Sequence, residues 1–184
     1  HSFPTRRSSD LRAEPAALPA EVTKLLRMFD SSQFEFSSCF GSLEEALASG
    51  PGFLDLFSGS RGVAKELVKQ AQTWVLTFDL SHSPSENLPS PPLQGQILRL
   101  IGCGAFRAMG AGPVCASFST AVTPPGRNRE YPEGVPWASE LQQEKNRIGN
   151  LLLRFVLQAV EACCEAEMIF WVENPHPSWL DRKS

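Results

Sequence analysis

Three short segments of this 184-residue chain carry residue types that can do chemistry. The first is Asp55-Leu56-Phe57-Ser58-Gly59-Ser60-Arg61-Gly62, in which an apolar run enters a glycine-rich turn. Such a turn lets the backbone approach a cofactor closely, where a side chain would block it. Asp79 closes the next apolar run, 20 residues after Gly59, and an acid there can accept hydrogen bonds from ribose hydroxyls. We therefore predict a nucleoside-cofactor site, with an ordinary strand-turn-helix as the alternative.

The second segment surrounds a cysteine with glycine and proline: Gly112-Pro113-Val114-Cys115-Ala116-Ser117-Phe118-Ser119. A thiol in such a loop at the end of a strand can be presented to a substrate and activated by its surroundings. A free cysteine is also often a small buried hydrophobic residue. The segment by itself leaves both interpretations open.

The third segment, Trp171-Val172-Glu173-Asn174-Pro175, places an acid directly after an apolar run. Partial burial of the Glu173 carboxyl would raise its pKa toward a value useful for acid–base chemistry. The alternative is a solvated glutamate at the end of a strand.

The elements that must position these segments alternate between strand and helix patterns. Short apolar runs predict strands over 53–57, 74–79, 105–111 and 168–172. Helical spacing predicts helices over 63–71, 94–102 and 138–164, and the last is expected to face the sheet through four residues: Leu152, Phe155, Val156 and Ala159. The alternation predicts an α/β fold, a parallel sheet flanked by helices. Ligands of such sheets bind at the carboxyl ends of the strands, where all three segments fall.

The two ends of the chain differ from the rest. Residues 1–11 and 181–184 read as translations of sequencing-adapter oligonucleotides, so we expect disordered additions to a natural segment over 12–180, truncated on both sides. Within it, residues 12–50 form a flanking segment with short helices over 22–29 and 43–48, and 51–180 form a partial core. Leaving out both ends removes four basic and two acidic side chains, which changes the net charge from −3 to −5. This acidic balance predicts that most contact with nucleic acid lies outside the segment.

Other features of the composition exclude several classes of protein. Five cysteines without a C-x-x-C pair suggest neither a disulfide framework nor a zinc site. We therefore expect no metal and a reducing, intracellular setting, the nucleus included. No stretch reaches the roughly 20 apolar residues of a membrane span. Loops over 81–92 and 121–137 are predicted to be solvated, which includes His82 and Arg127, with a mobile lid over the substrate as the alternative for the second loop.

Taken together, the three segments resemble the catalytic core of DNA cytosine-5 methyltransferases. Phe57-Ser58-Gly59-Ser60 resembles the Phe-x-Gly-x-Gly cofactor loop of that family. Residues 112–119 resemble its Gly-Pro-Pro-Cys-x-x-Phe-Ser nucleophile loop, and Glu173-Asn174 resembles its Glu-Asn-Val motif, in the same order. The resemblance implies a Rossmann-like, S-adenosylmethionine-dependent methyltransferase fold with an incomplete parallel sheet.

The resemblance also implies roles for individual residues. Cys115 would attack C6 of a cytosine flipped out of DNA, and Glu173 would hydrogen-bond N3 and the exocyclic amine of the base. C5 would then take the methyl group of S-adenosyl-L-methionine. The turn would line this cofactor and an acid would bind its ribose, through Phe57, Ser58, Gly59, Gly62 and Asp79.

The sequence departs from the family pattern at three positions. Arg61 interrupts the glycines of the turn, Val114 replaces the proline before the nucleophile, and Pro175 replaces the valine of Glu-Asn-Val. We find no Gln-Arg-x-Arg loop and no target-recognition domain, so we expect this segment to be inactive alone. Two alternatives stay open, a catalytically silent Rossmann-like binding module and a methyltransferase for another acceptor. The sequence leaves the oligomeric state undetermined.

Overall fold

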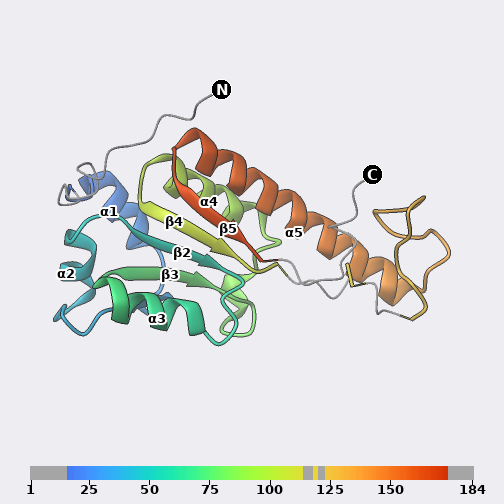
Figure 1. The fold of residues 1–184 in the computed structure, drawn as a ribbon, viewed down its shortest axis with the longest axis horizontal. Helices are drawn as coiled ribbons and strands as arrows, with labels where there is room; N and C mark the ends of the chain where they lie inside the picture. The colour runs from blue at the N-terminus through green and yellow to red at the C-terminus, as the bar shows by residue number, and fades with distance from the viewer. Residues whose placement is uncertain (1–15, 114–117, 120–122, 174–184) are drawn as a thin grey trace, which may run out of the picture.

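One five-stranded sheet forms the centre of the fold (Figure 1). The structure is a computed structural model, which describes residues 16–113, 118–119 and 123–173. The strands are β1 (Phe34–Phe36), β2 (Gly52–Leu56), β3 (Trp74–Phe78), β4 (Phe106–Ala111) and β5 (Ile169–Val172). Their order in the sheet is β1-β3-β2-β4-β5, in which β2 to β5 pair in parallel and β1 pairs antiparallel with β3. The predicted α/β class and its four parallel strands are confirmed.

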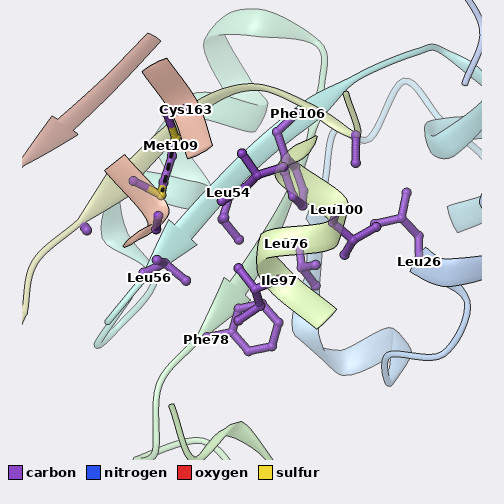
Figure 2. Packing of buried hydrophobic residues seen from close by; sticks show 14 of the residues in the cluster. Leu26, Leu54, Leu56, Leu76, Phe78, Ile97, Leu100, Phe106, Met109 and Cys163 are labelled. Carbon is purple, nitrogen blue, oxygen red and sulfur yellow. Dashed lines mark hydrogen bonds between the residues drawn. The ribbon is translucent and has the colours of Figure 1, made fainter. Parts of the chain in front are cut away.

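Helices cover both faces of this sheet. They are α1 (Ala20–Leu26), α2 (Leu43–Ala48), α3 (Gly62–Ala71), α4 (Pro91–Gly102) and α5 (Glu140–Glu165), with 3₁₀ turns η2 (Ser31–Gln33) and η3 (Pro84–Glu86). Side chains alternate between the faces of a strand. Leu54 and Leu76 accordingly pack in the larger core with α1, α4 and α5, whereas Val75 packs with α3. Figure 2 shows Ile97 and Leu100 of α4 beside the strand residues of the larger core.

The longest helix, α5, links this core to the carboxyl edge of the sheet. Ser139 caps it by accepting a hydrogen bond from the Gln142 amide at 3.3 Å, as a serine before a helix is expected to do. The helix begins beyond the ends of the strands and runs back along the sheet (Figure 1). All four residues predicted to face the sheet are buried: Leu152, Phe155, Val156 and Ala159. The prediction of a helix over 138–164 is confirmed.

Among the strands of the described residues, β1 is the one that the sequence did not predict. Phe34-Glu35-Phe36 is too short to show a reliable alternation, and its strand state comes from pairing with β3. Residues of the predicted flanking segment thus add a strand to the sheet and helices to the larger core.

The order of the strands fixes where a ligand is expected. The chain passes from β2 to β3 on one side and then crosses to β4 on the other side of β2. In open α/β sheets ligands bind outside the carboxyl ends of the strands, at the point where the direction of winding changes. Here that point lies at the carboxyl ends of β2 and β4, which places Phe57 and Gly112 beside it. Among the described residues, we find no helix both long and apolar enough to cross a membrane.

Candidate functional site

The turn that follows β2 has an unusual backbone. Phe57, Gly59 and Arg61 have φ angles of 62°, 49° and 60°, all in the left-handed region. Glycine adopts this region freely, whereas Phe57 and Arg61 do so at a cost. Such local strain concentrates where a ligand is bound or chemistry is done. The turn therefore has the conformation expected of a binding loop, and Gly62 follows it as the first residue of α3.

Asp79, at the end of β3, holds this turn closed. Its Oδ2 accepts a hydrogen bond from the Gly59 amide at 2.9 Å, and its Oδ1 accepts from the amide and hydroxyl of Ser81 at 2.9 and 2.6 Å. Burial alone would raise the pKa of the Asp79 carboxyl, but these hydrogen bonds outweigh it and hold the pKa below its ordinary value. The carboxylate is therefore charged at neutral pH and keeps lone pairs for further donors.

His82 and Arg61 support the same turn from the other side. The His82 Nε2 atom hydrogen-bonds the Gly59 carbonyl, and Nη2 of Arg61 lies 3.3 Å from its Nδ1 atom. The same Nδ1 atom also lies 3.4 Å from Oε2 of the buried Glu86. Arg61 also donates to the Ser32 carbonyl at 2.6 Å and pairs with Glu35 at 3.3 Å. The prediction that His82 is solvated is wrong, because the Gly59 carbonyl and Arg61 hold its ring in the turn.

A cavity of about 320 Å³ opens between the carboxyl ends of β2 and β3 and the first turns of α5. Apolar side chains supply most of its wall, among them Phe57, Leu80 and Ile148. Its polar groups come from Asp79, Glu86 and Lys145. A largely apolar cavity of this size with a few polar groups is typical of small-molecule sites. Phe57, Gly59 and Asp79 were predicted to share one concave site. Phe57 and Asp79 line this cavity, whereas Gly59 is not among its lining residues.

Two buried polar atoms near this edge have no hydrogen-bond partner among the described residues, Asp55 Oδ2 and Ser58 Oγ. Asp55 lies in β2 and is only 7% exposed. The pKa of the Asp55 carboxyl is raised to about 6. Burial is the main cause, and the negative charges of Glu173 and Asp79 add to it. Orphaned acceptors are rare in folded proteins and call for a reason, of which an absent ligand is one.

The raised pKa gives stability a pH dependence. The folded carboxyl of Asp55 keeps its proton up to about pH 6, whereas the unfolded one loses it near its ordinary value of 3.8. This group therefore lowers the free energy of unfolding as the pH rises from about 4 to 6, with no further change above. Asn cannot ionise, so Asp55→Asn removes this pH dependence. We expect the free energy of unfolding of the variant, relative to that of wild type, to be about 1–3 kcal/mol higher at about pH 8 than at about pH 4.

Urea unfolding at several pH values measures this difference. Glu66→Gln, which replaces an exposed acid of α3, is the control and should show no such gain at high pH. A pH-independent effect of Asp55→Asn would contradict the assignment of a raised pKa to this carboxyl.

Glu173 lies at the same edge, directly after β5. Its amide donates to the Ala111 carbonyl at 2.8 Å, and its Oε2 lies 3.8 Å from the position that a Cβ would take on Gly112. The side chain is exposed, not partly buried as the sequence suggested. Cys115 lies outside the described residues. The structure therefore relates Glu173 to the cysteine segment only through its distance to Gly112, which lies three positions before Cys115.

Sequence reasoning missed three residues of this region. Asp55 had a signal, a lone acid inside an otherwise apolar strand. Glu86 is only 1% exposed and accepts from the Asp79 amide at 2.8 Å, but it stands in a serine- and proline-rich loop that looked solvated. Arg127 was predicted to be solvated and is instead buried, because the loop that carries it folds back onto α5. The burial of Glu86 and Arg127 depends on tertiary contacts, which the local sequence pattern does not show.

The described residues contain no group of three or more His, Cys, Asp or Glu side chains arranged to hold a metal ion. Comparison of the chain with protein-family models, with curated proteins and with solved structures gave no match.

Proposed function

We propose that this chain is the S-adenosylmethionine-binding core of a methyltransferase of the DNA cytosine-5 type, with the Rossmann-like fold of that class. The observation that carries the proposal is the strained Gly59 turn, closed by Asp79 and opening beside an apolar cavity at the carboxyl edge of the sheet. The order of the strands supports a ligand at this edge, and the resemblance of the three sequence segments supports the choice of ligand.

The residues present fit the nucleoside half of the cofactor. The apolar wall formed with Phe57 and Leu80 suits a flat base, which prefers apolar and aromatic neighbours. The Asp79 carboxylate, charged and held in place by Gly59 and Ser81, suits the ribose hydroxyls. Arg61 stands where the family pattern has glycine, but its side chain is bonded to Ser32, Glu35 and His82 and is not part of the cavity wall.

The two orphaned atoms fit the amino-acid half. Asp55 Oδ2 is a buried acceptor that an ammonium group would satisfy, and Ser58 Oγ can accept or donate. A positive charge beside Asp55 would also offset the burial that disfavours its ionised form. When bound, S-adenosylmethionine supplies an electrophilic methyl group. What the chain supplies is the site that orients it.

The acceptor chemistry is proposed for Cys115 and Glu173. The Cys115 thiolate would form a bond to C6 of the cytosine, while Glu173 holds N3 and the exocyclic amine. This bond would make C5 a carbon nucleophile. C5 would then take the methyl group as the S–CH₃ bond of the cofactor breaks, with S-adenosylhomocysteine as the leaving group, and loss of the C5 proton would release the thiolate. The position of Glu173 beside Gly112 supports its approach to the segment that carries the cysteine.

Isothermal titration with S-adenosylmethionine and S-adenosylhomocysteine tests the cofactor part of the proposal. We expect both to bind with Kd values between about 1 μM and 1 mM, the range of ordinary enzyme substrates. NAD⁺ should produce no binding heat, because the turn lacks the dinucleotide pattern. Absence of binding by both sulfur-containing nucleosides would overturn the proposal.

A further inference from the structure

A buried arginine, Arg127, lies between α5 and Phe118. The Arg127 side chain is only 1% exposed. Its Nη1 donates to the Pro132 carbonyl at 2.6 Å and to Asn150 Oδ1 at 2.8 Å, and its Nη2 donates to the Asn146 carbonyl at 3.1 Å. Burying a guanidinium is costly unless its donors are satisfied. These three bonds therefore fix the side chain in one orientation against the helix.

The same guanidinium stacks on the nucleophile segment. Its central carbon lies 4.0 Å from the centroid of the Phe118 ring, and Phe118 is itself only 5% exposed. This is a close cation–π contact in a desolvated place, where such contacts are strongest. Phe118 follows Cys115 by three residues. Arg127 thus connects the carboxyl-terminal side of that segment to α5.

The helix provides a firm base for this contact. Asn146 Nδ2 donates to the Gly126 carbonyl at 2.8 Å, and Asn150 Nδ2 donates to the Glu133 carbonyl at 2.8 Å. The loop that carries Arg127 is therefore bonded to two successive turns of α5. Further along, Phe155 and Val156 of the same helix are buried in the main core. A continuous series of contacts runs from the sheet through α5 and Arg127 to Phe118.

We infer that Arg127 is a positioning residue, which orients the Cys115 segment by holding Phe118 against α5. The catalytic consequence rests on the proposed function, whereas the ordering of the segment does not. Lysine would not replace the arginine, because a single ammonium cannot reach both asparagines and also lie flat on the ring. Phe118 transmits the effect, so its loss should resemble the loss of Arg127.

Amide hydrogen exchange tests the ordering directly. In Arg127→Lys, Arg127→Met and Phe118→Leu, we expect peptides that span 112–119 to exchange about 10-fold faster, the equivalent of one lost desolvated cation–π contact. Peptides from β2 and β3 should exchange as in wild type. Arg147→Met is the matched control, because this arginine also lies on α5 but has an exposed side chain that pairs with the neighbouring Glu144. Unchanged exchange at 112–119 in the Arg127 variants would overturn the inference.

Covalent trapping on DNA with 5-fluorocytosine, by the protein expressed from its complete transcript, tests the catalytic consequence. We expect the trapping rate to fall on the order of 100-fold in Arg127→Lys and Phe118→Leu, with the affinity for S-adenosylmethionine unchanged, since small misplacements of a reacting group have effects of this size. Wild-type trapping rates in these variants would contradict the inference. No trapping by wild type would defeat the proposed function alone, and the exchange experiment would still decide the role of Arg127. If Arg127→Met does not fold, Phe118→Leu decides the outcome of both the exchange experiment and the trapping experiment.

Discussion

Replacing Gly59 by tryptophan is expected to abolish measurable binding of S-adenosylmethionine. A Cβ placed on Gly59 would meet no atom within 4 Å, so a side chain there projects into open space beside the candidate cofactor site. An indole there would stand next to Asp79, whose carboxylate accepts from the Gly59 amide at 2.9 Å and which lines the cavity. We expect a loss of affinity of more than about 100-fold, that is, more than about 2.7 kcal/mol of binding free energy. Isothermal titration measures it.

The strain of the substitution needs its own control, because Gly59 has a φ of 49° and any side chain there is disfavoured. Gly104 offers a match, since it has a φ of 72° and open space around its Cβ position, but it precedes β4 at the opposite edge of the sheet. Gly104→Trp should lose a similar amount of stability and keep the affinity of wild type. Equal affinities in the two variants would show that the ligand does not lie at the Gly59 turn.

The sequence was sufficient for the elements that carry a strong period. The long helix was predicted because its apolar stripe repeats over many turns, and the four parallel strands because each is a short apolar run between loops. Periodicity says nothing about partners, so it could not show that Phe34–Phe36 pairs with β3. It also could not give the order of the strands, which is what places the turn after β2 at the winding change.

The candidate site was predictable only where backbone conformation leaves a sequence signal. Gly59 marks the turn in the sequence. The acid that ends the next strand, Asp79, was also predicted, and its carboxylate accepts a hydrogen bond from the Gly59 amide. The side chains of His82 and Arg127 were misplaced because each contacts groups about 20 positions away in the sequence. These are Gly59 and Arg61 for His82, and Asn146 and Asn150 for Arg127. Loop composition predicts solvation on average, and it fails where a charged side chain finds a full set of buried partners.

Cys115→Ser is expected to eliminate covalent trapping of the protein on a 5-fluorocytosine duplex. In the proposed reaction the cysteine sulfur bonds to C6, C5 takes the methyl group with release of S-adenosylhomocysteine, and fluorine replaces the proton whose loss would free the enzyme. A serine hydroxyl is a far weaker nucleophile than a thiolate at neutral pH. We expect a loss on the order of 10⁴-fold or more, which is the effect of removing a nucleophile in other enzymes. Denaturing gels of the protein from its complete transcript measure the adduct.

Controls for this experiment exist on the same chain. Cys103 and Cys164 are exposed free thiols, so Cys103→Ser and Cys164→Ser should trap like wild type. Glu173→Gln should slow trapping while preserving the affinity for S-adenosylmethionine, because the role proposed for Glu173 is to hold the base. For both residues to act on one base, the thiol and the carboxylate must lie within about 10 Å of each other. Trapping that persists in Cys115→Ser would show that another group attacks the base, which would overturn the role proposed for Cys115.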